Sequence, residues 1–114
     1  MRLYNAPAHR LAHLAGLAEI RRLLGVEPDP EIWQVEARGR LRYEEPDAYW
    51  HSPDGLIAIE FDNGSYSRRI IERKLTTFED RGFVRTIWGA TSASRVRYMS
   101  QFPGLETHLV EWWR

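Results

Sequence analysis

Residues 56–64 read LIAIEFDNG, and this stretch decides the fold. Its apolar and β-branched residues predict a strand over residues 56–61, which the turn at Asn63-Gly64 ends. Because side chains alternate along a strand, the apolar residues at 57, 59 and 61 share one face, whereas Glu60 and Asp62 share the other. The sequence therefore predicts an apolar strand that carries two carboxylates on one face near its end.

The sequence on either side of this strand predicts further helices and strands. Gly25 and Gly82 are helix stops that follow the first two predicted helices. The predicted helices span residues 8–24, 65–81 and 92–101, and the other predicted strands span residues 32–38, 48–51, 83–88 and 107–113. The order α-β-β-β-α-β-α-β is typical of a mixed central sheet flanked by helices. We therefore expect a single α/β domain over residues 1–114.

The composition limits the class of protein. Its 114 residues are 43% hydrophobic and 12% aromatic, which is enough for one domain with a real core. The 16 basic residues balance 16 acidic ones, so any nucleic-acid surface has to be a local patch. The absence of cysteine excludes disulfides, thiolate metal sites and a cysteine nucleophile. No apolar run is long enough to span a membrane and no signal peptide is apparent, so we expect a cytoplasmic protein.

A third carboxylate is predicted close to the two on the central strand. Pro46-Asp47 precedes the neighbouring strand, and the hairpin between the strands brings Asp47 within range of Glu60 and Asp62. Converging carboxylates repel each other unless a cation or a proton lies between them. Such oxygen ligands suit Mg²⁺ or Mn²⁺. The alternative is that Asp62 belongs only to a polar turn and that Asp47 only caps a strand.

Lys74 is the only lysine, since the other fifteen basic residues are arginines. At about 100° per residue, Ile70, Ile71, Leu75 and Phe78 fill one arc of the second helix, and Lys74 falls inside that arc. A lysine on a packed face is costly unless it pairs with an anion or its head reaches water. The position therefore predicts a charge aimed at the carboxylates of the sheet or, alternatively, a lysine that reaches solvent at the edge of the arc.

At these residues the chain resembles a known superfamily. Pro46-Asp47, twelve intervening residues and then Glu60-Phe61-Asp62 are similar to the motif of the PD-(D/E)XK nucleases, whose core has the predicted element order. More narrowly, PDAYW followed by IAIEFDNGSYSRRIIERKL resembles the replication-relaxation family of plasmid and phage proteins. The resemblance implies a restriction-endonuclease-like core. It also implies a metal-dependent DNA nuclease or nickase, linked to a mobile element or to plasmid replication.

The resemblance also implies roles for individual residues. Asp47 and Glu60, with Asp62, would bind Mg²⁺ or Mn²⁺, and Lys74 would orient the nucleophile or neutralise negative charge. Asp62 departs from the motif, because it stands where a lysine is usual. Some members carry that lysine on the following helix, and Lys74 would then be the displaced group. If it is not, the chain is a catalytically inactive DNA- or protein-binding module on the same fold. A third interpretation is an unrelated α/β interaction domain.

Basic residues of the helices are candidates for contact with DNA. Arg68, Arg69 and Arg73 cluster in the first two turns of the second helix, where terminal amides also favour phosphate. Arg95 and Arg97 on the last helix would extend this patch. The alternative for the cluster is a solvated helix face.

Other side chains have weaker claims to a role. His51 faces the same way as Asp47 along its strand and could lie at the rim of the site. Glu19 is the only acid of the first helix that the resemblance would add, whereas His13 falls among leucines and is interpreted as packed. Trp112-Trp113 could close the core or form a dimer surface, so a homodimer or a larger complex stays open beside DNA as a partner.

Overall fold

Five strands form one mixed sheet, and three helices cover its two faces. The computed structural model describes residues 8–36, 45–64 and 66–113. In chain order the elements are α1 (Ala8–Leu24), β1 (Trp33–Val35), β2 (Ala48–Ser52), β3 (Gly55–Asp62), α2 (Arg68–Asp80), β4 (Arg85–Ala90), α3 (Ala93–Met99) and β5 (Leu105–Leu109). The α/β class and the predicted order αβββαβαβ are confirmed. None of the helices in this part of the chain is long and apolar enough to cross a membrane.

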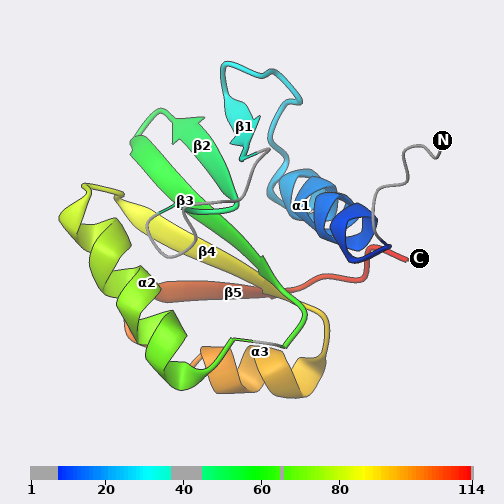
Figure 1. The fold of residues 1–114 in the computed structure, drawn as a ribbon. Helices are drawn as coiled ribbons and strands as arrows, with labels where there is room; N and C mark the ends of the chain where they lie inside the picture. The colour runs from blue at the N-terminus through cyan, green and yellow to red at the C-terminus, as the bar shows by residue number, and fades with distance from the viewer. Residues whose placement is uncertain (1–7, 37–44, 65, 114) are drawn as a thin grey trace, which may run out of the picture.

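The strands lie in the sheet in chain order, from β1 to β5. The first three pair antiparallel, and β3, β4 and β5 pair parallel. Parallel neighbours need a crossover, which α2 provides between β3 and β4 and α3 between β4 and β5. The carboxyl ends of β3 and β4 therefore meet the amino end of β2 at one end of the sheet (Figure 1).

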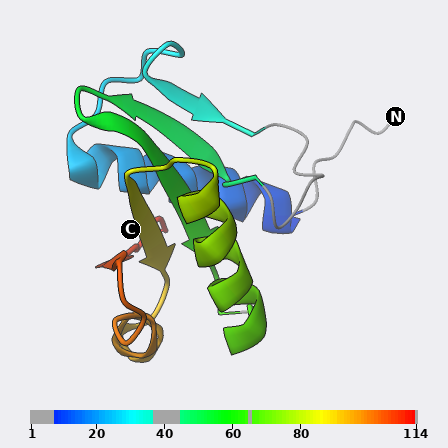
Figure 2. The same cartoon turned by 90° about the vertical axis from the view of Figure 1, so that its left-hand side faces the viewer.

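The two faces of β3 belong to two separate cores. α1 covers one face and α2 and α3 cover the other, as Figures 1 and 2 show. The core under α1 joins Leu17 and Ile20 to Ile57, Ile59 and Phe61, the apolar face that the sequence predicts. The core under α2 and α3 contains Ile71, Trp88, Met99 and Phe102. The opposite face of β3, which carries Glu60 and Asp62, therefore packs against α2 and α3.

The predicted boundaries are wrong at three strands. β1 ends at Val35, and residues 37 and 38 of the predicted strand lie outside the described residues. β4 starts two residues later than predicted, because the Phe83 N–H still bonds back to the carbonyl of Phe78 in the turn after α2. β5 covers Leu105–Leu109 rather than 107–113. The neighbouring strand β4 ends at Ala90, whose carbonyl accepts from the Val110 N–H, so the residues after Val110 have no β4 residue to pair with. Trp112 and Trp113 therefore lie outside the sheet.

Candidate functional site

Asp47, Glu60 and Lys74 come together where β2 begins and β3 ends. The Lys74 ammonium nitrogen lies 3.4 Å from Glu60 Oε2, and the Asp47 backbone N–H donates to the same oxygen at 3.2 Å. The Lys74 and Glu60 side chains are only 3% and 0% exposed, whereas that of Asp47 is 17% exposed. The cluster is therefore a buried ion pair with Asp47 on its solvent side.

The register of the hairpin places Asp47 beside Glu60. Ala48 pairs with Ile59, so the residue before Ala48 lies opposite the residue after Ile59. The Asp47 carboxylate accepts a hydrogen bond from the Phe61 N–H at 2.9 Å through Oδ2. Asp47 thus caps the free peptide group of β3, as the alternative interpretation expects, while it also lies next to the Glu60 carboxylate.

The helix α2 directs Lys74 toward the sheet. Its buried residues are Ile71, Lys74 and Phe78, which share one arc at helical spacing. The Lys74 ammonium also lies 5.3 Å from the ring centre of Tyr66 and 5.6 Å from that of Phe78. Aromatic faces therefore stabilise this charge together with Glu60. The alternative that Lys74 reaches solvent at the edge of the arc is wrong.

Glu60 bears the main electrostatic cost of the cluster. Burial, and after it the neighbouring Asp47 carboxylate, raises the pKa of Glu60 well above its usual range, and the Lys74 ammonium opposes this rise. Glu60 Oε1 is buried without a hydrogen-bond partner among the described residues. An unsatisfied buried acceptor of this kind costs about 1–3 kcal/mol, and more when it is charged. The arrangement favours a proton or a cation at Oε1, and such perturbed carboxylates are concentrated at functional sites.

Asp62 lies on the same face of β3 as Glu60 but is held by other partners. Its Oδ2 accepts hydrogen bonds from Arg95 at 2.8 Å and from the Trp88 indole N–H at 3.2 Å. Its Oδ1 accepts from the Gly64 N–H at 2.6 Å, and Arg95 also donates to the Tyr66 carbonyl at 2.6 Å. Asp62 therefore ties the turn after β3 to α3, so Arg95 points inward instead of extending a surface patch.

The helix α1 adds His13 to the cluster. His13 Nε2 lies 3.3 Å from Asp47 Oδ1, and the side chain is 36% exposed. The imidazole also packs edge-on against Phe61, with ring centres 5.8 Å apart. The leucines around His13 in the sequence indicate its packing. They do not indicate its polar partner, because Asp47 lies 34 residues further along the chain. His13 is the first-helix residue at this site.

Two other polar candidates lie away from the cluster. Glu19 pairs with Arg22 within α1. His51 lies near the hairpin end of β2, where its Nε2 is 3.0 Å from Gln34 Oε1. With a rise of about 3.3 Å per residue, His51 is roughly 13 Å along the strand from Asp47. It therefore does not form the rim of the site.

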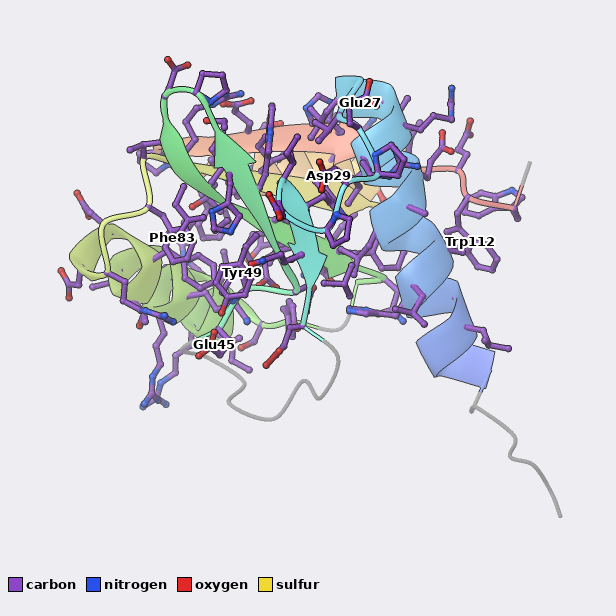
Figure 3. All side chains as sticks on the ribbon, turned by 90° about the horizontal axis from the view of Figure 1, so that it is seen from above. Glu27, Asp29, Glu45, Tyr49, Phe83 and Trp112 are labelled. Carbon is purple, nitrogen blue, oxygen red and sulfur yellow. The ribbon has the colours of Figure 1, made fainter. Side chains whose placement is uncertain are left out.

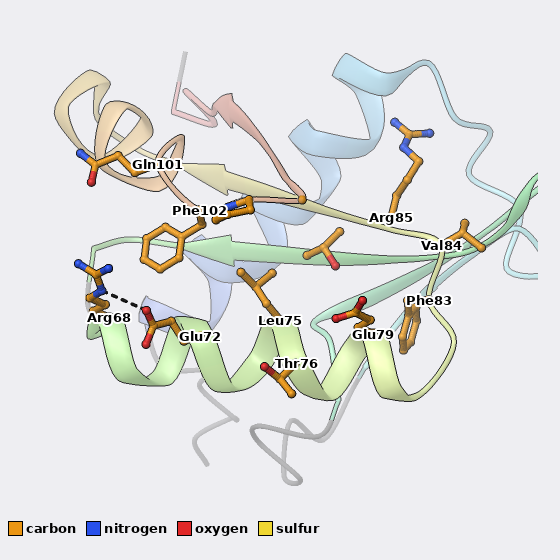
Figure 4. Close-up of a pocket in the computed structure, with 13 residues that line it drawn as sticks. Arg68, Glu72, Leu75, Thr76, Glu79, Phe83, Val84, Arg85, Gln101 and Phe102 are labelled. Carbon is orange, nitrogen blue, oxygen red and sulfur yellow. Dashed lines mark hydrogen bonds and ion pairs between the residues drawn. The ribbon is translucent and has the colours of Figure 1, made fainter.

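One of the three arginines of α2, Arg68, borders a separate groove. Arg68, Arg69 and Arg73 are all exposed on the first turns of the helix. Arg68 donates to Glu72 at 3.1 Å and lies 5.9 Å from the ring centre of Phe102. The groove that Arg68 lines, shown in Figure 4, has a volume of about 660 Å³. Its lining runs from α2 to β4 and to the turn before β5 and includes Leu75, Glu79, Arg85, Thr86 and Phe102. Neither Glu60 nor Lys74 lines it.

The carboxylates can be compared with the needs of a divalent ion. Among residues 8–36, 45–64 and 66–113, no group of three or more histidine, cysteine, aspartate or glutamate side chains is arranged to hold a metal ion. Mg²⁺ commonly uses one or two carboxylates and fills its remaining positions with water and phosphate oxygens. Asp47 and Glu60 provide that number, and the unpaired Glu60 Oε1 is an available ligand atom. The residues therefore fit an ion of this type.

Comparisons with protein-family models, with curated proteins and with solved structures find no match to this chain.

Proposed function

We propose that this chain is a DNA nuclease or nickase that depends on Mg²⁺ or Mn²⁺. The observation that carries the proposal is the Glu60 carboxyl group, which is buried between Asp47 and Lys74 with one oxygen unpaired. The element order is also the order that the resemblance to PD-(D/E)XK nucleases implies. A link to a mobile element or to plasmid replication follows from the narrower resemblance to the replication-relaxation family.

In this proposal each residue of the cluster has a distinct role. Asp47 and Glu60 would hold the ion, which when bound would supply a water of lowered pKa and positive charge beside the phosphate. Lys74 orients the attacking water or neutralises negative charge as it develops. His13 fixes the orientation of the Asp47 carboxylate, as a hydrogen-bond partner of a metal ligand commonly does. Asp62 acts indirectly, because Arg95 and Trp88 bond to its Oδ2 and the Gly64 N–H in the turn after β3 bonds to its Oδ1.

Contact with DNA is assigned to the exposed arginines of α2. Replacing both Arg68 and Arg69 with alanine is expected to weaken DNA binding and to flatten its dependence on salt, because fewer counterions are released. Arg22→Ala on α1 is the matched control, since Arg22 is also an exposed arginine paired with a glutamate on its own helix. Equal loss of binding in the control would contradict this assignment. Filter binding over a series of salt concentrations measures the effect.

The second candidate is a catalytically inactive DNA- or protein-binding module. One observation favours it: Glu60 and Lys74 are almost completely closed off from solvent and already neutralise each other. In that case the cluster needs no ion, and the carboxylates contribute only to the structure.

Cleavage of plasmid DNA in Mn²⁺ or Mg²⁺ tests the proposal. The wild type is expected to nick or cut, and Asp47→Asn, Glu60→Gln and Lys74→Ala are each expected to abolish cleavage while circular dichroism shows a folded chain. Lys74→Arg should also fail, because a planar guanidinium cannot replace a compact ammonium on a packed face. Asp54→Asn is the matched control, since Asp54 is an exposed carboxylate in the hairpin turn.

Two results would overturn catalysis. The first is a wild type that leaves supercoiled, linear, branched and single-stranded DNA intact at low salt and high protein concentration. The second is cleavage by Lys74→Ala at the wild-type rate. DNA binding without cleavage, lost on removal of Arg68 and Arg69, would instead identify the inactive module.

A further inference from the structure

The outer side of β5 presents backbone groups that have no strand partner in the described part of the chain. β5 is the last strand of the sheet, and β4 pairs with its other side. The Val110 N–H donates to the Ala90 carbonyl at 2.8 Å, so the peptide groups of residues 106, 108 and 110 face β4. The N–H and C=O of Thr107 and Leu109 therefore point away from the sheet, and among described residues no backbone hydrogen bond reaches them.

Edge strands of this kind usually carry features that prevent pairing with another chain. Common features are a very short strand, proline, lysine or a bulge. The opposite edge, β1, has only three residues. β5 has five residues, LETHL, with neither proline nor lysine, and its register with β4 is continuous from Leu105 to Leu109. β5 therefore lacks these four features.

We propose that β5 pairs antiparallel with β5 of a second copy of this chain, around a two-fold axis at Thr107. This register places Leu105 opposite Leu109, Glu106 opposite His108 and Thr107 opposite itself. Each direct pair is then apolar with apolar, acidic with basic, or hydroxyl with hydroxyl, combinations that stabilise neighbouring strands. An axis at Glu106 would place two carboxylates opposite each other, and an axis at His108 would place Glu106 opposite Val110. The sequence of β5 is therefore complementary to itself in one register.

The side chains along β5 support this pairing on both faces of the sheet. Thr107 Oγ1 lies 3.1 Å from Ser100 Oγ of α3, which places the odd-numbered side chains on the α3 face. There Leu109 is 41% exposed, so its pairing with Leu105 of the partner would bury apolar surface. On the other face Arg85 donates two hydrogen bonds to Glu106, at 2.6 and 2.8 Å. The Glu106 carboxylate is thus fixed beside the position of the partner's His108.

The exposed tryptophans add apolar area next to the strand. Trp112 and Trp113 follow β5 and are 36% and 53% exposed, and Trp112 lies beside α1 (Figure 3). A two-fold interface uses the same patch of both copies, so the tryptophan pair of one copy follows one end of the paired strands and that of the other copy follows the other end. The occupant of the edge is therefore a second copy rather than an unrelated peptide, because the charge pattern and the apolar pairs match this chain itself.

Sedimentation analysis of the purified chain tests the proposal. The wild type is expected at twice the 13.4 kDa mass of the chain. Thr107→Pro is expected to sediment as a monomer, because proline removes an outward N–H but none of the bonds to β4. Val35→Pro is the matched control. Ile32 and Glu36 bond to the β2 side, so by alternation the Val35 N–H points to the outer side of β1. The Val35→Pro variant should therefore remain a dimer. His108→Glu should dissociate the dimer and His108→Lys should keep it, since only the first places like charges opposite Glu106.

Three outcomes would overturn the proposal. They are a wild type that is monomeric up to submillimolar concentration, a folded Thr107→Pro variant that remains a dimer, and dissociation by Val35→Pro alone. Should Thr107→Pro fail to fold, His108→Glu and His108→Lys decide: equal masses of the two variants would contradict β5 pairing. Thermal melts of each variant show whether the change of mass occurs in a folded chain.

Discussion

Removal of the Lys74 charge should destabilise the domain far more than removal of the Glu60 charge. Lys74→Met keeps a flexible apolar stem between the rings of Tyr66 and Phe78 but leaves Glu60 and Asp47 without the ammonium. Glu60→Gln keeps the shape and removes a charge whose pKa is raised even with Lys74 present. The surroundings of residue 60 therefore penalise a carboxylate charge more than water does.

The structure sets the size of this asymmetry. At the 3.4 Å that separates Lys74 from Glu60, an effective dielectric constant of about 20 gives an attraction of about 5 kcal/mol. Breaking a buried pair from one side costs about 3–5 kcal/mol. At about 4 °C per kcal/mol for a domain of this size, Lys74→Met should melt roughly 12–20 °C below the wild type. Glu60→Gln should stay within about 1 kcal/mol of the wild type or exceed it, because the rings of Tyr66 and Phe78 still face the Lys74 ammonium and the repulsion from Asp47 is removed. The double variant should recover most of the loss of Lys74→Met.

A double-mutant cycle in urea measures the coupling, with a surface pair as control. Arg68 and Glu72 are 3.1 Å apart on the same helix, but their side chains are 70% and 56% exposed. Removing Arg68, Glu72 or both should therefore give a coupling of only about 0.3–0.5 kcal/mol. If the coupling between Glu60 and Lys74 is as small as this, or if Lys74→Met unfolds at the wild-type urea concentration, the electrostatic argument is refuted.

The same argument predicts a dependence on pH. The pKa of Glu60 is higher in the folded state than the ordinary 4.5, so the folded state binds this proton first as the pH falls. The contribution of Glu60 to stability is therefore most unfavourable above the raised pKa and improves as the pH falls through it toward 4.5. As the pH falls from the raised pKa toward 4.5, Lys74→Met should gain more stability than the wild type, because the ammonium no longer opposes the rise in the pKa of Glu60. Glu60→Gln should lack this gain in stability.

Three further predictions concern other parts of the domain. Millimolar Mn²⁺ should raise the melting temperature of the wild type but not of Asp47→Asn, because an ion present at about 100 times its dissociation constant adds about 2.7 kcal/mol. Arg95→Met should cost about 3–5 kcal/mol in urea unfolding, because it leaves Asp62 as a buried charge without its cation; a loss below 1 kcal/mol would contradict this role. Gly16→Ala should cost about 1–3 kcal/mol, because a Cβ at Gly16 would lie 2.5 Å from the Phe61 ring; Ala12→Gly serves as a control for helix propensity.

Periodicity alone predicts the central part of this structure. In the second half of β3 the apolar Ile59 and Phe61 alternate with the acidic Glu60 and Asp62, so its two faces and the direction of Glu60 follow from the sequence. α2 has an apolar arc that includes Lys74, so the direction of its only lysine follows in the same way. The contact between Lys74 and Glu60 follows from these two patterns together. The apolar arc of α2, which includes Lys74, packs on the face of β3 that carries Glu60.

Long-range partners are not predictable in this way. Arg95 bonds to Asp62 because the parallel register pairs Asp62 with Ala90, which brings the first turn of α3 beside the end of β3. His13 reaches Asp47 because α1 crosses the face of β3 at Phe61. Both contacts depend on how helices sit across the sheet, which sequence spacing does not encode. The end of β5 is not predictable for a related reason: the length of β5 is set by the end of β4 and not by its own apolar residues.

The cluster also separates the two functional interpretations on physical grounds. A buried ion pair can usually be replaced by apolar residues without loss of stability, so stability alone does not explain why charges occupy the core here. If Asp47 and Glu60 bind an ion, the unpaired Glu60 oxygen is satisfied only when the ion is present. The wild type then gains stability from Mn²⁺, and Glu60→Gln loses that gain. If the cluster is only structural, Glu60→Gln removes an unfavourable charge and raises stability, and Mn²⁺ changes neither protein. The two interpretations thus predict opposite responses of one pair of melting curves, and that comparison does not depend on knowing which DNA the protein acts on.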